Sequence, residues 1–140
     1  ALHDLNEMGY TLALVADTYV GTYKNVLGQH DLYDIFEAFA ISTEVGCLKP
    51  DPRMFQKALD DLEIEKKDYK RVIMVGNNLE RDIVGANKMG LITVWSNWND
   101  NDHYKKVPEA VDEHPDYEMR TLPELIDLLA KIEGDLKNVG

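Results

Sequence analysis

The sequence predicts an α/β fold with a mostly parallel sheet, and two observations support that prediction. Short apolar runs of strand length alternate along the chain with segments whose apolar residues recur at helical spacing. Three of these runs, TLALVA (11–16), RVIMV (71–75) and LITVW (91–95), are continuously apolar, which is typical of strands covered on both faces. Because strand–helix–strand units make right-handed crossovers, we expect a parallel sheet with helices packed on both sides.

The individual elements follow from the periodic segments and from the capping residues and glycines that bound them. In chain order we expect a helix over 2–8 that ends at Gly9, a strand over 11–16, a helix over 20–27 that ends at Gly28, a weaker strand over 36–42, a helix over 52–62, strands over 71–75 and 91–95 on either side of a helix over 79–90, a long acidic loop over 97–116 and a final helix. Asp51 is an N-cap candidate ahead of Pro52, whose missing N–H costs nothing in a first helical turn. Thr121 and Glu124 have the spacing of a capping box for the final helix.

The composition narrows the possible classes of function. A chain of 140 residues is long enough for one domain with a buried core. The net charge of −11 argues against a nucleic-acid partner, because nucleic-acid phosphates bind basic surfaces. No apolar run reaches membrane-spanning length, so we expect no membrane partner. The single cysteine, Cys47, cannot form an internal disulfide, which favours a reducing, cytoplasmic location.

Polar residues follow the predicted strands, at the carboxyl ends where α/β sheets place their functional sites. They are the segments 16–18, 42–49, 76–78 and 96–97. The stretch MVGNNLERDIVGA (74–86) has the form of a loop that holds a metal ion or a phosphate. A metal would favour carboxylates at the turn, but positions 77 and 78 are both asparagine. Whether this loop is catalytic is therefore the main question that the sequence raises.

Two motifs at these positions are specific. Lysine precedes Pro-Asp-Pro in GCLKPDPRMFQKAL (46–59), and Val-Gly-Asn-Asn precedes Asp-Ile-Val-Gly-Ala in VIMVGNNLERDIVGANKMGLITVW (72–95). In this order and at this separation they resemble the haloacid dehalogenase-like (HAD) superfamily, in its phosphatase and dehalogenase branch, over roughly residues 1–130. The resemblance implies a three-layer, Rossmann-like core, and we interpret residues 1–140 as a single HAD-like core domain.

The resemblance also implies a mechanism. Members of the family use a nucleophilic aspartate, within an Asp-x-Asp signature on a first strand, to attack phosphorus or carbon and form a covalent intermediate. A Ser or Thr after the second strand binds the transferring group, a lysine neutralises its developing charge, and acidic residues hold Mg²⁺. By position, Lys49 corresponds to the lysine, Asn77 to the first metal-site aspartate and Asp82 to the second. The resemblance thus makes Lys49 and Asp82 catalytic candidates, and Asn77 and Asp82 metal-site candidates.

Three departures from the family pattern concern the site. First, no predicted strand carries the Asp-x-Asp signature and no cap domain is present, so we interpret the chain as a fragment that lacks the first, nucleophile-bearing strand and the cap. Second, the hydroxyl position after the second strand is Ala16. Its neighbours Asp17 and Thr18 are candidates for substrate binding, although capping of the next helix is the preferred interpretation. Third, Asn77 brings no charge, which weakens or abolishes a Mg²⁺ site.

The remaining candidates also have structural interpretations. Asn77 and Asn78 are good helix caps, and we interpret Asn77 as a cap rather than a metal ligand. Asp82 either orients Lys49 or favours a helix amino terminus through the macrodipole, and the sequence leaves both possibilities open. For Lys49, the surrounding motif favours the functional role over that of an ordinary surface lysine.

Two classes of function compete. The first is a HAD-like hydrolase core of the phosphatase type, inactive as this isolated chain because the nucleophile segment is missing. The alternative is a catalytically degenerate pseudo-hydrolase that serves as a binding or interaction module. A further alternative is a metal-independent dehalogenase-like enzyme, although Ala16 lacks the hydroxyl that such enzymes use after the second strand.

The expected partners follow from the first class of function. If active, the protein would act on a small phosphorylated or other small-molecule substrate, with Mg²⁺ as the cofactor that the resemblance implies. The missing strand is expected between the runs 11–16 and 71–75. Without it, the inner strands keep unpaired backbone groups, so we expect an amino-terminal segment or another chain to complete the sheet.

Overall fold

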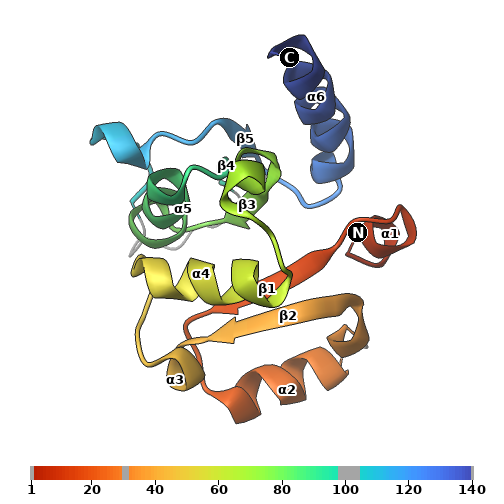
Figure 1. Ribbon diagram of the computed structural model, residues 1–140, viewed down its shortest axis with the longest axis vertical. Coiled ribbons are helices and arrows are strands. Elements are labelled where there is room, and N and C mark those ends of the chain that lie inside the picture. The colour runs from red at the N-terminus through yellow and green to blue at the C-terminus, as the bar shows by residue number, and fades with distance from the viewer. Residues whose placement is uncertain (1, 30–31, 98–104, 140) are drawn as a thin grey trace. The chain divides into compact units, whose positions relative to one another are not determined.

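The computed structural model describes residues 2–29, 32–97 and 105–139. The chain folds as two compact units, Leu2–Asp68 and Tyr69–Gly140, and each contains a parallel sheet with helices (Figure 1). The predicted α/β class with parallel strands is therefore confirmed. The interpretation of the whole chain as a single domain stays a prediction. Among the described residues, every helix is too short or too polar to span a lipid bilayer.

The first unit contains a two-stranded sheet in which β1 and β2 run parallel. Its elements are α1 (Leu2–Glu7), β1 (Leu12–Ala16), α2 (Val20–Gln29), η1 (Tyr33–Ile35), β2 (Phe36–Ile41), α3 (Ser42–Val45) and α4 (Pro52–Asp61). A core cluster forms around the buried side chains of Leu27 on α2 and Ile41 on β2, with Phe39 packed against it. Helix α4 buries Met54 and Phe55. As predicted, Asp51 is the N-cap of α4, and its Oδ1 accepts a hydrogen bond from the backbone N–H of Arg53 at 2.9 Å.

The second unit contains a three-stranded parallel sheet in the order β3-β4-β5. Its elements are β3 (Ile73–Gly76), the π-helical turn η3 (Leu79–Ile83), α5 (Val84–Met89), β4 (Ile92–Ser96), η4 (Val111–Glu113), β5 (Tyr117–Met119) and α6 (Glu124–Val139), and η2 (Lys66–Arg71) precedes β3 in the chain. Helices η3 and α5 occupy the crossover between β3 and β4, the connection that parallel neighbours require.

The two faces of this second sheet carry different helices. Leu79 and Ile83 of η3 form a buried cluster with Trp95 of β4, so η3 covers the Trp95 face. Side chains alternate along a strand, so Val94 and Ser96 point to the opposite face. Tyr117, which pairs with Val94, donates a hydrogen bond to Asp135 of α6 at 2.6 Å. Helix α6 is therefore tied to the second face, and the sheet has helices on both sides.

The predicted element boundaries are confirmed to within a few residues, with two exceptions. Strand β5 (Tyr117–Met119) was not predicted, and it lies just after the loop expected over 97–116, of which 98–104 fall outside the described residues. The capping box was wrong. Helix α6 begins only at Glu124, after a tight turn, and the Glu124 carboxylate accepts from the N–H of Arg120 instead of Thr121.

The predicted burial of two strands was also wrong. The sequence predicts coverage on both faces for β1 and β3, but every residue of both strands is only partly buried. By contrast, β4 is buried at all positions after its first. For β3 the physical reason is position, because β3 ends its sheet and has a hydrogen-bonded strand on one side only, whereas β4 has one on each side.

Candidate active site

The half of the predicted site in the first unit is built around Lys49, in the segment between α3 and α4. Its backbone N–H donates to Asp17 Oδ1 at 3.0 Å. Its side-chain Nζ donates to the carbonyl of Val15 at 3.2 Å. Val15 and Asp17 lie at the carboxyl end of β1, so both the backbone and the ammonium group of Lys49 are held at that strand end. The structure thus brings two predicted site residues, Lys49 and Asp17, together.

The tip of β1 is also joined to the end of β2. The carbonyl of Thr18 accepts hydrogen bonds from Ser42 Oγ at 3.0 Å and from Thr43 Oγ1 at 3.3 Å. These hydroxyls come from the start of α3, directly after β2, whereas position 16 at the end of β1 is alanine. The hydroxyl groups near this strand end therefore support the loop backbone. Substrate binding by Asp17 and Thr18, and their capping of α2, both stay predictions.

The half of the predicted site in the second unit lies at the end of β3. Asn78 is the N-cap of η3, because its Oδ1 accepts from the backbone N–H groups of Glu80 and Arg81, both at 3.1 Å. The interpretation of Asn77 as a cap was therefore wrong. The helical turn starts at Leu79, which assigns the capping position to Asn78. The Asn77 side chain makes no hydrogen bond within the described part of the chain, and only its carbonyl is used, by Trp95 Nε1 at 3.2 Å.

Asp82 is the most tightly placed candidate. It is buried, and its Oδ2 accepts from the backbone N–H of Asn78 at 3.1 Å. A Cβ atom at Gly76 would lie 2.4 Å from Asp82 Cβ and 2.5 Å from Asp82 Oδ2, well inside van der Waals contact. Glycine is thus required at position 76 for Asp82 to occupy this place. The contact with Asn78 gives Asp82 a structural role at the turn, while its proposed action on Lys49 stays a prediction.

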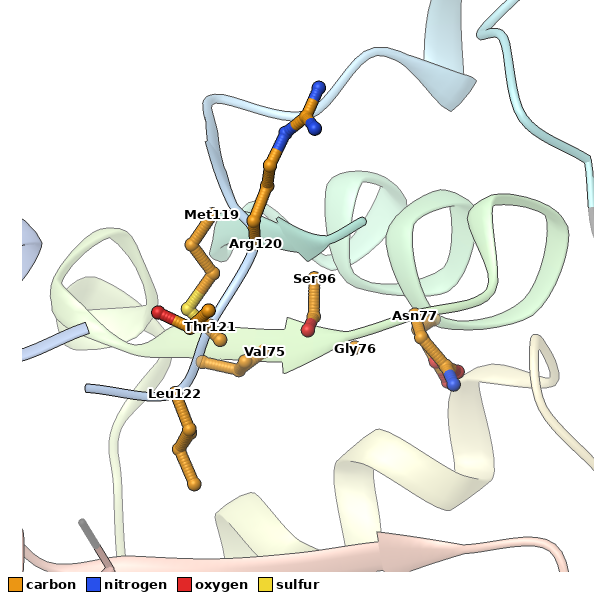
Figure 2. A pocket seen from close by; sticks show the side chains of 9 residues that line it. Val75, Gly76, Asn77, Ser96, Met119, Arg120, Thr121 and Leu122 are labelled. Carbon is orange, nitrogen blue, oxygen red and sulfur yellow. The ribbon is translucent and has the colours of Figure 1, made fainter. Parts of the chain in front are cut away.

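A pocket of about 620 Å³ opens beside this turn (Figure 2). Asn77 and Asp82 line one part of it, and Ser96 at the end of β4 lines another. Val75 and Gly76 of β3, together with residues 119–122 from β5 and the segment after it, complete the wall. The sequence placed Ser96 at a strand end without assigning it a role. The 119–122 segment was missed because β5 itself was not predicted.

The family assignment rests on a comparison with known proteins. Residues 1–96, more than half of the chain, match the family model described as haloacid dehalogenase-like hydrolase. The chain belongs to the haloacid dehalogenase-like hydrolase family. The resemblance inferred from the lysine motif and the Gly-Asn-Asn loop is therefore confirmed.

The similar proteins of this family include both phosphatases and a dehalogenase. A glyceraldehyde 3-phosphate phosphatase of Pyrococcus furiosus is 32% identical over 136 residues, which cover 96% of this chain and 54% of that protein. A crystal structure of a HAD phosphatase from Thermococcus onnurineus has a TM-score of 0.73 at 30% identity, covering 91% of this chain and 54% of that one. A solved dehalogenase has a TM-score of 0.76 at 27% identity, covering 91% of this chain and 52% of its own. The chain thus spans about half the length of these relatives.

HAD phosphatases generally use Mg²⁺, so the residues at the end of β3 can be tested for a fit to this ion. Mg²⁺ requires near-octahedral oxygen ligation and favours carboxylates. The pocket offers the Asn77 amide and the Asp82 carboxylate, one oxygen of which already accepts from Asn78. Within residues 2–29, 32–97 and 105–139, no group of three or more His, Cys, Asp or Glu side chains could hold a metal. The described residues of this chain therefore do not form a Mg²⁺ site by themselves.

Proposed function

We propose that this chain is the core part of a phosphatase that acts on a small phosphate monoester and becomes catalytic when another segment supplies its aspartate nucleophile. The observation that carries the proposal is the placement of Lys49, whose Nζ is held at the carboxyl end of β1 by the Val15 carbonyl. The relatives support the same class, because a glyceraldehyde 3-phosphate phosphatase and a HAD phosphatase are among them.

In this proposal each residue of the chain has one role. The Lys49 ammonium group neutralises the charge that develops on the transferring phosphoryl group, an electrostatic effect that is strongest where the cation is already held in place. Asp17 fixes the Lys49 backbone and so fixes where the ammonium group starts from. The nucleophilic carboxylate attacks phosphorus, displaces the alcohol and leaves an aspartyl phosphate that water hydrolyses.

The need for a completing segment follows from the two exposed strands. Each of β1 and β3 has one strand neighbour and stays partly exposed along its length. A free sheet edge presents unpaired N–H and C=O groups that favour pairing with a further strand. We propose that such a strand comes from a segment equivalent to the part of the relatives that has no counterpart in this chain. The same segment would carry the nucleophile.

Two alternatives differ from this proposal in their chemistry. A pseudo-hydrolase is favoured by the loss of a hydroxyl at Ala16 together with the loss of a carboxylate at Asn77. A metal-independent dehalogenase is favoured by the neutral Asn77 and by the likeness to a solved dehalogenase, but it would need a hydroxyl at position 16. The experiments below separate these alternatives from the phosphatase.

The first experiment measures turnover of p-nitrophenyl phosphate. The isolated 140-residue chain should give no turnover above that of its Lys49→Ala variant, because the covalent path has no nucleophile. The protein extended by its native amino-terminal sequence should turn over, and Lys49→Ala should lower its kcat by about a hundredfold or more. Lys57→Ala, which removes an exposed lysine from α4, is the matched control and should leave kcat unchanged.

Three results would contradict the proposal. Turnover by the isolated chain that Lys49→Ala abolishes would show that the nucleophile lies within the 140 residues. An extended protein that turns over neither a phosphate ester nor a 2-haloacid would support the pseudo-hydrolase. Turnover of the haloacid alone would support the dehalogenase.

The second experiment measures Mg²⁺ binding to the isolated chain by calorimetry. Binding should not saturate at low-millimolar Mg²⁺, and Asn77→Asp should strengthen it by adding a carboxylate beside Asp82. Asn78→Asp is the matched control, because it adds the same charge one residue away and aspartate retains the capping role. Equal effects of the two substitutions, or no effect of Asn77→Asp, would show that position 77 is not a ligand.

A further inference from the structure

The pocket in the second unit extends well beyond the turn that carries Asn77 and Asp82. It continues past Ser96 at the end of β4 to Met119 of β5 and to Leu122, which precedes α6 (Figure 2). Ser96 pairs with Met119 in the sheet, so the two side chains point to the same face. A volume of about 620 Å³ lies within the range of small-molecule sites, about 300–1,000 Å³. The pocket therefore has room for more than a phosphate group.

Ser96 is the polar group that distinguishes this part of the pocket. It is 6% exposed, yet its hydroxyl has no hydrogen-bond partner among the described residues. Other buried hydroxyls in the molecule are paired: Ser42 Oγ donates to the Thr18 carbonyl, and Thr93 Oγ1 donates to Asn87 Oδ1 at 3.0 Å. Among the described residues no fully buried side-chain oxygen or nitrogen lacks a partner, so the Ser96 hydroxyl is open to the pocket, where a bound molecule can hydrogen-bond to it in place of water. Ser96 is thus placed to bind a ligand.

The chemistry of the wall indicates what kind of ligand fits. Val75, Met119 and Leu122 provide apolar surface, and the Thr121 hydroxyl, like that of Ser96, is uncharged and has no hydrogen bond within the described ranges. The guanidinium group of Arg120 extends away from the strand ends, as Figure 2 shows. Without a cation directed at Ser96, this part of the pocket is poorly suited to an anion. Hydroxylated carbon chains match it, because they combine C–H surface with hydroxyl groups that donate and accept.

We propose that the pocket binds the uncharged, hydroxylated part of a small phosphate ester, with Ser96 hydrogen-bonded to one of its hydroxyl groups. This assignment rests on the proposed phosphatase function and adds a specificity-determining residue to it. The polyol end of the ester lies toward Ser96 and Met119, and its phosphate end leaves the pocket at the strand ends, on the Asn77 side. Ser96 therefore selects among phosphate esters by the hydroxyl groups of the alcohol that is released.

The test uses the ¹⁵N-labelled 140-residue chain and two separate probes, D-ribose and inorganic phosphate, in NMR titrations. D-ribose should shift the amide signals of Ser96, Met119 and Thr121. Ser96→Ala should weaken ribose binding about fivefold to tenfold, which is the value of one hydrogen bond. Inorganic phosphate should leave these three signals unchanged.

Ser42→Ala is the matched control, since Ser42 is also buried at a strand end, with 8% exposure, but its hydroxyl is already paired. Ser42→Ala should lower the melting temperature by about 3–6 °C and leave ribose binding unchanged. Ser96→Ala should do the reverse, weakening binding without lowering the melting temperature, because it breaks no bond within the protein. A serine with only a structural role would instead lower the melting temperature when replaced and would leave ribose binding unchanged.

Three results would overturn the proposal: no shift with ribose, shifts with phosphate in place of ribose, or equal ribose affinity for Ser96→Ala and the unmodified chain. Each concerns binding alone, so none depends on turnover. If the extended protein fails to hydrolyse phosphate esters but ribose binds as expected, the proposed function fails and the polyol site remains. If turnover is found but ribose does not bind at Ser96, the proposed phosphatase function stands and the polyol site fails.

Discussion

Strands β3 and β4 are neighbours in one sheet, paired from Ile73 opposite Ile92 to Gly76 opposite Trp95, yet their surroundings differ sharply. Both are apolar, but β3 is partly exposed at all its positions, whereas β4 is buried at all but its first. Strand β4 has a neighbour on each side, while β3 has one. The comparison teaches that an apolar sequence indicates the burial a strand is suited to, and that its place in the sheet decides the burial it reaches.

The first unit shows unequal burial without a central strand, because β1 and β2 are the two ends of a two-stranded sheet. Strand β1 is partly exposed throughout, whereas β2 has fully buried positions at Ala40 and Ile41. The two strands without a fully buried residue are therefore also the two whose ends carry Lys49 contacts and the Gly-Asn-Asn loop. This coincidence is what a completing strand would explain, and the following predictions test the contrast from the largest expected effect to the smallest.

Hydrogen exchange should separate β3 from β4 most clearly. The Val72 carbonyl accepts from Ile92 at 2.8 Å, and alternate residues of a parallel strand point their N–H groups to opposite sides, so the N–H groups of Ile73 and Val75 face the free edge. These two amides should exchange with opening free energies near zero. The β4 amides should approach the global stability, typically about 5–15 kcal/mol. Slow exchange of Ile73 and Val75 in a monomer would show that the edge is closed within this chain, and the completion proposal would fail.

Gly76→Ala should be the most disruptive single substitution at the end of β3. The added Cβ would meet Asp82 at 2.4 Å, so we expect a loss of about 3 kcal/mol in the free energy of unfolding. Gly134→Ala is the control, because nothing lies within 4 Å of its added Cβ and alanine favours the helix interior by up to about 1 kcal/mol. Urea unfolding of both variants measures the difference. If both substitutions have the same sign, the close approach of Gly76 and Asp82 is not as described.

Val75 and Val94 lie opposite each other and allow the same substitution on each strand. Val94 is 0% exposed, so Val94→Ala should cost about 2–3 kcal/mol, including the cavity that it leaves. Val75 is partly exposed, and Val75→Ala should cost about 1 kcal/mol. Denaturant melts of the two variants give the comparison directly. Equal losses would mean that β3 is buried in solution, by association or by a rearranged sheet.

Substitution of Tyr117 should have the smallest effect on stability, because Tyr117 lies on β5 and affects the buried strand β4 only indirectly. Its hydroxyl donates to Asp135, which raises the pKa of Tyr117 to about 12. Because the folded pKa exceeds the unfolded value of about 10, this bond stabilises the fold below pH 10, and the stabilisation is lost as the pH rises through 12. Tyr117→Phe should therefore lower stability by about 1 kcal/mol at pH 8 and progressively less above pH 10.

A spectroscopic titration checks the same bond independently. Tyrosine ionisation, followed by ultraviolet absorbance, should include one group near pH 12 that disappears in Tyr117→Phe. Tyr33→Phe removes a tyrosine that stacks on Phe39 in the first unit and serves as the control. Loss of the late-titrating group in Tyr33→Phe would show that the bond to Asp135 is not the cause.

The sequence predicted the elements whose signal is local, and it missed those that depend on neighbours. Strand β4 and the Asp51 cap follow from apolar runs and short-range chemistry, and both are confirmed. Strand β5 has only three residues, with Glu118 in the middle, so its pairing with β4 has no periodic signature. The partial exposure of β3 could not be predicted because it depends on which strands lie beside it in the sheet.

The candidate site shows the same division. The motif placed Lys49 at a strand end, and the structure adds the Val15 and Asp17 contacts that hold it there. Asn77 and Asn78 were both cap candidates, and the start of the helical turn at Leu79 decides that Asn78 is the cap and Asn77 is not. The pocket around Ser96 required β5, so no local pattern could have indicated its extent.

The contact between Gly76 and Asp82 has a consequence for how this sequence can change over time. Since a Cβ at position 76 would overlap Asp82, the two positions are not independent in the mutations they tolerate. A larger residue at 76 becomes acceptable only after 82 has become smaller, whereas a smaller residue at 82 needs no prior change at 76. The order of substitutions is therefore constrained in one direction, and lineages that keep the aspartate must also keep the glycine.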